Sequence, residues 1–318
     1  MDSPNEKPVP PTNPGLSWRS LQPADVEALS ALATACLAAD GGHILGAAET
    51  YLQEHYFSTQ PRVSIGAFEM DGRLVACAAA HPTHTPQEHR ATIVGQVHPD
   101  CRRRGFGTFL VKWSIAEASN VLAAHPLDRP CVLQITTEML TEAAARLFEL
   151  HGFALQFAED VMRCDLHAPL PEVMLPSVIK FTTWSPALVD QFFAVYQAAF
   201  RDRPGFPDWS QEKWLAWVAP DDDDFRPKMS LLADHDDLRV GFIVCAENWI
   251  VQMGVRPERR GQGIGAALLM EVLRRFRAAG EDHVLLDVNV NNPRAASVYS
   301  RLGFERAGRR ARYERALT

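Results

Sequence analysis

The sequence predicts an α/β protein made of two tandem copies of one unit, each a mixed central β-sheet flanked by helices. Two phrases repeat in the same order along the chain. "RRRGFG" (102–107) returns as "RGQGIG" (260–265) at an offset of 158 residues, and "LHGF" (150–153) returns as "RLGF" (301–304) at an offset of 151. In each half, runs suited to strands alternate with runs suited to helices, which favours a sheet covered by helices on both faces.

The bulk properties exclude several classes of protein. A chain of 318 residues is long enough for two domains, each with its own core. The net charge of −7 argues against nucleic-acid binding through bulk electrostatics. No apolar run reaches 18 residues, so no membrane span is expected. Residues 1–15 are polar and proline-rich, which predicts a disordered N-terminal segment rather than a signal peptide. We therefore expect a cytoplasmic protein.

Cysteine and histidine patterns do not indicate a metal centre. The six cysteines are scattered without a CxxC pair, which favours buried free thiols over ligands or disulfides. His81, His84 and His89 fall in "HPTHTPQEH", among proline and threonine rather than on one helix face. We interpret this segment as a solvated loop and expect no metal.

Proline-rich "HAPLPEVMLPS" (167–177) indicates a linker between the halves. The expected organisation is therefore a lead-in at 1–15, a first domain at 16–166, and a second domain at 178–318. In the second half the patterns predict, in order, a strand at 178–184, a helix at 185–200, a hairpin around "HDDL", a strand at 249–255, a helix from the glycine turn to Gly280, a strand at 283–290, a helix at 293–302 and a last strand at 310–317.

A strand that ends in a glycine-rich turn and leads into a helix makes an anion site. The first N–H groups of the helix have no intrahelical partner, and glycines let the backbone approach a phosphate closely. Neither turn has the GxxxxGK[ST] of a P-loop or the GxGxxG of a dinucleotide fold. The alternative is that the glycines only start a helix and the arginines are solvated. That alternative would explain one such glycine turn, but it explains two poorly.

These residues resemble the [R/Q]-x-x-G-x-G acyl-CoA signature of the GNAT N-acetyltransferase superfamily, twice and over nearly the whole chain. The resemblance implies two tandem GNAT-like domains that use acetyl-CoA, with loop amides on the pyrophosphate and the preceding strand along the pantetheine. The implied cofactor contacts in the second half are Met253, Val255, Arg260, Gly261, Gln262, Gly263, Ile264, Gly265, Ala266 and Asn292. Those in the first half are Gln96, Val97, Arg102, Arg103, Arg104, Gly105, Phe106, Gly107 and Thr108.

The family also implies an acid for the departing thiolate, a tyrosine on the helix before the final Gly-Phe. Tyr299 occupies that position in the second half, and the offset of 151 places Phe148 there in the first half. Phenylalanine fills the same volume but has no proton to give. We therefore expect the C-terminal domain to be catalytic and the N-terminal domain to bind CoA without chemistry.

The attacking amine has a pKa near 10.4 and must lose a proton, so a base or a water relay is needed. Backbone N–H groups of "QMGVRP" are expected to stabilise the oxyanion, with Gly254 marking a bulge. Gln252 has no basic group, and Glu247 is the best single candidate for the base. A water relay and a carboxylate from the substrate-side helices remain open alternatives.

The acceptor side is expected from residues 200–225, which carry several aromatic side chains followed by Asp221–Asp224. These are either core aromatics with an acidic loop or an aromatic mouth that attracts a cationic amine. The expected function is acetyl-CoA-dependent N-acetylation of a primary amine of a small molecule. The alternatives are acetylation of a protein amine and a non-catalytic acyl-CoA sensor, and the sequence leaves the acceptor and the oligomeric state open.

Overall fold

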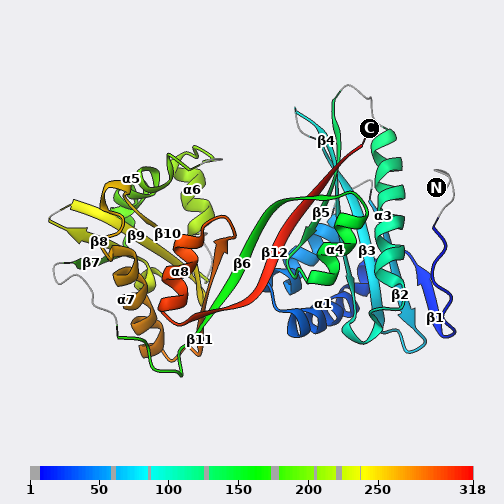
Figure 1. Ribbon diagram of the computed structural model, residues 1–318, viewed down its shortest axis with the longest axis horizontal. Helices are drawn as coiled ribbons and strands as arrows, with labels where there is room; N and C mark the ends of the chain where they lie inside the picture. Colours follow the sequence, from blue (N-terminus) through cyan, green and yellow to red (C-terminus); the bar gives the residue numbers. More distant parts are fainter. Residues whose placement is uncertain are drawn as a thin grey trace. The chain divides into compact units, whose positions relative to one another are not determined.

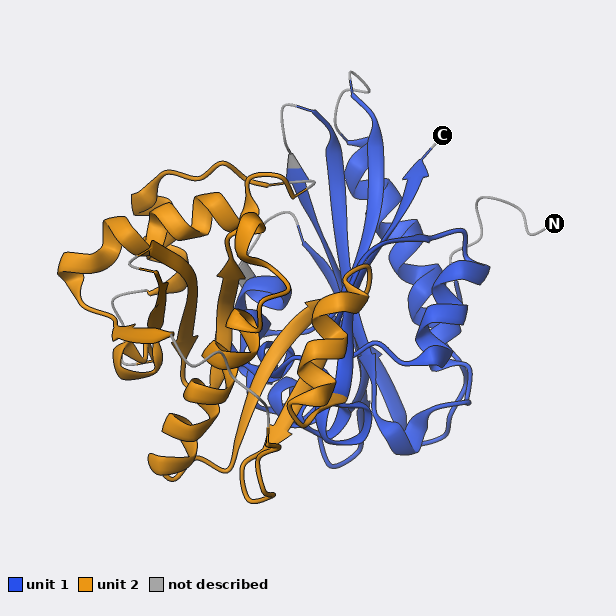
Figure 2. Ribbon diagram, turned by 60° about the vertical axis from the view of Figure 1, so that its left-hand side comes forward, with its two compact units in different colours: residues 1–160, 307–318 blue, residues 161–306 orange. Residues whose placement is uncertain are grey.

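The computed structural model describes residues 8–58, 62–84, 87–124, 129–172, 179–203, 206–219, 224–236 and 238–317. It divides into two compact units, shown in different colours in Figure 2. Unit 1 comprises residues 1–160 and 307–318, and unit 2 comprises residues 161–306. The expected disorder of residues 1–7, residues 173–177 of the expected linker (167–177) and three of the four loop aspartates (221–223) lie outside the described residues.

Unit 1 is a mixed sheet with the strand order β1-β2-β3-β4-β5-β12 (Figure 1). Neighbouring strands are antiparallel except β4 and β5, which are parallel. Helices α1 and α2 pack on one face of the sheet and α3 packs on the other. The elements are β1 (Leu16–Arg19), α1 (Val26–Asp40), α2 (Glu49–Gln53), β2 (Val63–Glu69), β3 (Leu74–His84), β4 (His89–Val97), α3 (Phe106–Ala123), β5 (Cys131–Thr137) and α4 (Glu142–Leu150).

Unit 2 repeats this plan with the strand order β6-β11-β10-β9-β8-β7, in which β10 and β11 are the parallel pair. Helices α5 and α6 cover one face of its sheet and α7 covers the other. The elements are β6 (Ala154–Asp165), β7 (Lys180–Thr183), α5 (Val189–Phe200), α6 (Gln211–Val218), β8 (Leu231–His235), β9 (Leu238–Ala246), β10 (Trp249–Val255), α7 (Ile264–Ala278), β11 (His283–Asn289), α8 (Pro293–Arg301) and β12 (Phe304–Leu317). The element order predicted for the second half is confirmed.

The last strand of the chain belongs mainly to unit 1. Residues 311–317 of β12 pair antiparallel with residues 131–137 of β5, and β6 likewise runs across the boundary between residues 160 and 161. The domain boundaries derived from the sequence repeat remain a prediction. In terms of packing, however, the C-terminal strand completes the sheet of the N-terminal half.

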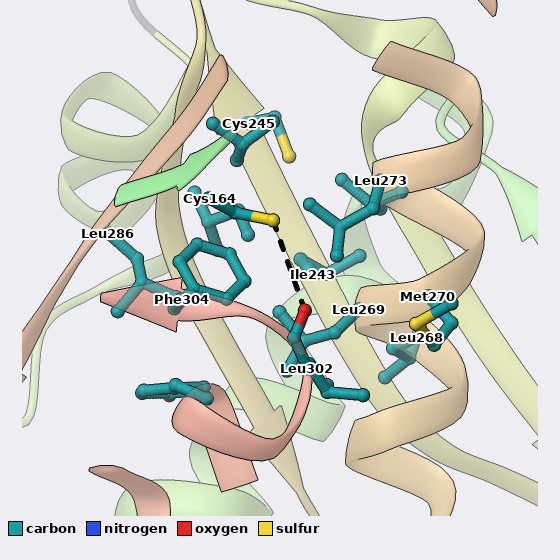
Figure 3. Packing of buried hydrophobic residues seen from close by; sticks show 14 of the residues in the cluster. Cys164, Ile243, Cys245, Leu268, Leu269, Met270, Leu273, Leu286, Leu302 and Phe304 are labelled. Carbon is teal, nitrogen blue, oxygen red and sulfur yellow. Dashed lines mark hydrogen bonds between the residues drawn. The ribbon is translucent and has the colours of Figure 1, made fainter. Parts of the chain in front are cut away.

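The core of unit 2 lies between its sheet and α7. Figure 3 shows Leu269 and Leu273 of α7 directed toward sheet residues such as Ile243. These side chains recur at the helical spacing that the sequence indicated, and each is buried. Burial of the α7 face fixes the helix against the sheet and so fixes the position of the glycine turn from which the helix starts.

All six cysteines are free and buried, as predicted. The solvated-loop interpretation of the histidine segment is wrong for two residues. His81 on β3 and His89 on β4 are only 9% and 6% exposed, because both strands extend to the tip of their hairpin. Within the described residues, no group of three or more His, Cys, Asp or Glu side chains could hold a metal ion, and no helix is long and apolar enough to cross a membrane.

Replacement of Tyr313 on β12 tests whether the last strand stabilises unit 1. Its side chain is 2% exposed and its ring lies 5.3 Å from that of Phe148. Tyr313→Ala should lower the free energy of unfolding by about 3–5 kcal/mol, the range for large buried aromatics. Urea unfolding followed by circular dichroism measures this. The control Leu150→Ala, at a side chain 83% exposed, should change it by less than about 0.5 kcal/mol. Equal effects would contradict the assignment.

Candidate active site

The glycine turn of unit 2 has the conformation of an anion site. After β10, Gly261 and Gly263 adopt φ values of 78° and 81°, in the left-handed region that favours glycine. Gly263 caps α7, and Ala267 donates a backbone hydrogen bond to the Gly263 carbonyl at 2.9 Å. The amides before Ala267 therefore lie at the positive end of the helix, where they can donate to a phosphate.

The turn of unit 1 has the same geometry with one difference. Gly105 caps α3 at φ 85°, and Phe109 donates to its carbonyl at 3.0 Å. Arg103, at the position of Gly261, adopts φ 60°. A non-glycine residue in this region is strained by about 1–2 kcal/mol. Strain that persists at a turn of this kind is consistent with a functional constraint on the backbone.

The first arginine of each motif braces its turn against the rest of the unit. Arg260 Nε donates to the Val255 carbonyl at 3.1 Å, and its Nη2 donates to the Ala199 carbonyl of α5 at 2.6 Å. Arg102 Nε donates to the Val97 carbonyl at 3.1 Å, and both of its terminal nitrogens donate to the Asp40 carboxylate at 2.6 Å. Each guanidinium thus ties the turn to the preceding strand and to a helix.

The other residues of the two turns divide between core and surface. Ile264 and Phe106 are each 2% exposed, so they could contact a cofactor only through their backbone. Arg104 and Gln262 are exposed, and Arg104 Nη2 donates to the Asp100 carbonyl at 3.0 Å. The turns therefore present backbone amides and peptide edges rather than a set of side chains.

The parallel strands diverge immediately before each turn. β10 and β11 are in register only at Trp249 with Leu285 and at Ile250 with Leu286. In unit 1 the corresponding register ends at Ile93 with Ile135. Beyond these pairs, the facing edges of β10 and β4 can bind an extended chain such as pantetheine. The expected backbone contacts at Met253 and Val255, and at Gln96 and Val97, lie on these stretches.

A β-bulge distinguishes the two units. β10 pairs with β9 through Ile250 and then through Gln252, which leaves Val251 as the extra residue, whereas β4 pairs with β3 in unbroken register. The expected bulge at Gly254 is therefore wrong. Gly254 pairs with Phe242, and a Cβ there would lie 2.8 Å from the Ala199 Cβ, so glycine is needed for close packing on α5. The bulge instead leaves Val251 as the residue of β10 that has no partner in the β9 register.

Tyr299 lies on α8 within the core that α7 covers, and it is 9% exposed. Burial raises the pKa of its phenol to about 12. The hydroxyl is therefore protonated at neutral pH and can act as a proton donor. In unit 1 the corresponding Phe148 carries no hydroxyl, and its ring packs on that of Tyr313.

Asn292 and its counterpart Thr141 cap their helices. The Asn292 side-chain oxygen accepts from the Ala295 amide at 3.3 Å, and the Thr141 hydroxyl accepts from the Ala144 amide at 3.1 Å. A shared capping role explains why both residue types occupy this position. The amide nitrogen of Asn292 is not used in the cap and is the group through which it could contact CoA.

Glu247 does not join the other predicted residues. It is exposed in the β9–β10 turn, with φ 45°, and its amide donates to the Asp224 carbonyl at 2.6 Å. This turn precedes β10, whereas the glycine turn follows it. Gln252 is also engaged, because its Oε1 accepts from Trp214 Nε1 at 2.8 Å.

Most aromatic residues of the expected acceptor stretch belong to the core. Trp214 is fully buried between α6 and the sheet, and Tyr196 stacks on it at 5.4 Å. Trp217 is 47% exposed and packs edge-on against Trp209 at 5.5 Å, with Lys213 over the Trp209 ring. The interpretation as core aromatics therefore holds for Trp214, whereas Trp209 and Trp217 form a pair at the surface.

Comparison with known proteins agrees with this geometry. Residues 189–304 match a family model described as "Acetyltransferase (GNAT) family", and residues 61–155 match an "Acetyltransferase (GNAT) domain". A mycothiol acetyltransferase of Frankia casuarinae is 34% identical over 257 residues, which cover 73% of this chain and 69% of that protein. One from Thermobispora bispora is 29% identical over 311 residues, covering 89% and 94%. A GCN5-related N-acetyltransferase structure from Sphaerobacter thermophilus superposes with a TM-score of 0.71 at 28% identity, covering 96% of both chains.

Two glycine turns on diverging parallel strands define an acyl-CoA-dependent transferase. The chain belongs to the GNAT family of acetyltransferases, in a tandem two-domain architecture similar to that of mycothiol synthase. Enzymes of this family take their acetyl group from acetyl-CoA. The open backbone around the glycines fits that donor, since a Cβ on Gly261 would meet no described atom within 4 Å.

Gly263→Glu tests the turn of unit 2 as the pyrophosphate site. The new side chain places bulk and negative charge at the helix N-terminus, so calorimetry on the full chain should show the acetyl-CoA affinity of unit 2 lowered at least tenfold. Gly280→Glu is the matched control, because Gly280 has a similar φ of 86° at the opposite end of α7. Unchanged affinity in a folded Gly263→Glu protein would contradict the site.

Proposed function

We propose that unit 2 transfers an acetyl group from acetyl-CoA to the primary amine of a small molecule. The observation that carries the proposal is a combination that the two units do not share. Unit 2 has the glycine turn, a bulge at Val251 beside the diverging strands, and the protonated phenol of Tyr299. Unit 1 has the turn, an unbroken β4 and Phe148.

The reaction uses these groups in order. An alkylammonium loses a proton to a base, and the free amine attacks the thioester carbonyl carbon. The carbonyl oxygen gains negative charge, which the backbone amide of Val251, the extra residue of the bulge, stabilises. The C–S bond then breaks as the amide forms, and Tyr299 protonates the departing thiolate. A second proton leaves the amine nitrogen and, through solvent, replaces the proton that Tyr299 gave to the thiolate. The products are therefore the amide, CoA thiol and one released proton.

The relatives favour a small acceptor, since several are named mycothiol acetyltransferases. We take the deacetylated form of mycothiol as the first acceptor to test, alongside glucosamine, spermidine and a lysine-containing peptide. CoA release measured with a thiol reagent reports turnover for each. Turnover of the peptide alone would replace the small-molecule proposal with protein acetylation. No turnover with any amine, despite acetyl-CoA binding, would favour an acyl-CoA sensor.

Tyr299→Phe removes one proton donor and keeps the ring. The kcat should fall by about 10²–10⁴, the range for a positioned acid–base group, while the affinity for acetyl-CoA stays within about twofold. Steady-state kinetics with the accepted amine and calorimetry measure the two quantities. Tyr313→Phe, another buried tyrosine that loses only its hydroxyl, should keep wild-type kcat. Near-wild-type turnover in Tyr299→Phe would limit Tyr299 to packing.

Unit 1 is proposed to hold CoA or acetyl-CoA without catalysing transfer. Support comes from the turn geometry that Gly105 shares with Gly263, together with Phe148 and the unbroken β4. A ligand that binds only the folded state stabilises it by RT ln(1 + [L]/Kd), about 2.7 kcal/mol at a hundredfold excess over Kd. Bound CoA would thus act as a structural ligand.

Gly105→Glu tests this role separately from catalysis. The part of the CoA-dependent rise in Tm that unit 1 contributes should be lost, because the acidic side chain displaces the phosphate from the α3 N-terminus. The kcat should remain within about twofold of wild type. Differential scanning calorimetry with and without CoA, beside an activity assay, separates the two. An unchanged thermal shift would show that the first turn is only a helix entry, and a large loss of kcat would show that unit 1 is catalytic.

A further inference from the structure

The groups described so far include no well-placed base for unit 2. We propose that Asp287 of β11 is the general base that deprotonates the acceptor amine. This inference rests on the acetyl transfer proposed above. It is carried by the position of Asp287 at the divergence of the two parallel strands.

Asp287 is the first residue of β11 after the parallel register ends. The last pair joins Ile250 and Leu286, so Asp287 follows at the point where the strands separate. The residue that follows Ile250 on β10 is Val251, the bulged residue. The carboxylate and the amide proposed for the oxyanion therefore flank the same point, where a thioester bound along β10 would end.

Asp287 faces the acceptor side of the sheet. Its neighbours Leu286 and Val288 belong to the core that α7 covers, so alternation along the strand places Asp287 on the opposite face. Gly254 of β10 meets the α5 residues Ala199 and Phe200 on that opposite face. Asp287 is thus on the α5–α6 side, from which the acceptor is expected to enter.

Tyr299 lies on the other side of the same sheet, in the α7 core. A base on one face can receive the ammonium proton while an acid on the other face protonates the thiolate. The proposed pair therefore gives each proton transfer its own side.

The burial of Asp287 also suits this role. The side chain is half-buried, and its Oδ1 is covered from solvent, while Trp249, Leu285 and Val161 form an apolar cluster next to it along the strand. A carboxylate at the edge of an apolar cluster is held in place by packing and loses part of its hydration shell. A carboxylate held in one position can accept a proton from an ammonium group bound beside it.

Other titratable groups on this face are less well placed. His283 lies four residues earlier on the same face of β11, about 13 Å away at 3.3 Å per residue, and its Nε2 contacts the Asn248 amide at 2.9 Å. Arg163 of β6 cannot act as a base because its guanidinium stays protonated, and its positive charge helps to lower the pKa of His283. Glu247 is exposed in the turn before β10.

Unit 1 lacks the carboxylate at this point. The 151-residue offset that relates α8 to α4 makes Thr136 the equivalent of Asp287 in unit 1. Thr136 likewise follows the last parallel pair, Ile93 with Ile135. Its hydroxyl accepts from the Gln134 side chain at 3.1 Å. The unit that lacks the bulge and the tyrosine thus also lacks this carboxylate.

The test is Asp287→Asn, which keeps the shape of the side chain and removes its basicity. With deacetylated mycothiol, or the amine of the panel that turns over fastest, kcat should fall by about 10²–10⁴ with acetyl-CoA affinity within twofold of wild type. The acid limb of the kcat/KM–pH profile should disappear, leaving only the rise due to deprotonation of the free amine. Asp282→Asn is the matched control, since that side chain is 72% exposed and pairs with His167.

Each outcome decides between defined alternatives. A kcat within twofold of wild type, or an acid limb that persists in Asp287→Asn, would overturn the assignment. If Asp287→Asn also lowers Tm, Asp287→Glu decides. With the carboxylate restored, it should recover both Tm and the acid limb, and recovery of Tm alone would show a structural role. A wild-type protein inactive on every amine would instead overturn the proposed function, and this inference with it.

Discussion

The parallel pair at the centre of each unit is hydrogen bonded over only its first residues, and the remaining features of the site depend on that early divergence. Once β10 leaves β11 after Ile250, its edge is open and its last residues lead directly into the glycine turn. A fully paired β10 would leave no backbone for pantetheine. The helix that starts at the turn is held by its own buried face, so the anion site and the open edge keep a fixed relation.

The first arginine of each glycine motif has a structural role, because it ties the turn to the rest of its unit. Arg260 and Arg102 both donate to the carbonyl of the last residue of the preceding strand. Their second partners differ, a backbone carbonyl of α5 in one unit and the Asp40 carboxylate in the other. The shared bond is therefore the one that the motif preserves, and it sets the exit direction of the strand toward the turn.

The two units differ at the groups proposed for the chemistry rather than at the glycine turn. Both turns place glycine in the left-handed region at the helix cap, whereas the bulge at Val251, the phenol of Tyr299 and the carboxylate of Asp287 occur in one unit only. The glycine turn and these three groups lie on different elements, so one unit can lack the groups while both units keep the turn. The strand β12, at the end of the chain, completes the sheet of unit 1.

The sequence by itself determined the repeat, the order of strands and helices, the glycine turns and the contrast between Tyr299 and Phe148. These are local signals, because glycine spacing, helical periodicity and residue identity can be read without knowing what packs where. The tertiary structure decided the bulge at Val251, the need for glycine at Gly254, the unit that β12 completes and the position of Asp287. Each of these depends on strand register, and register arises from pairing between residues far apart in the chain, which no local pattern specifies.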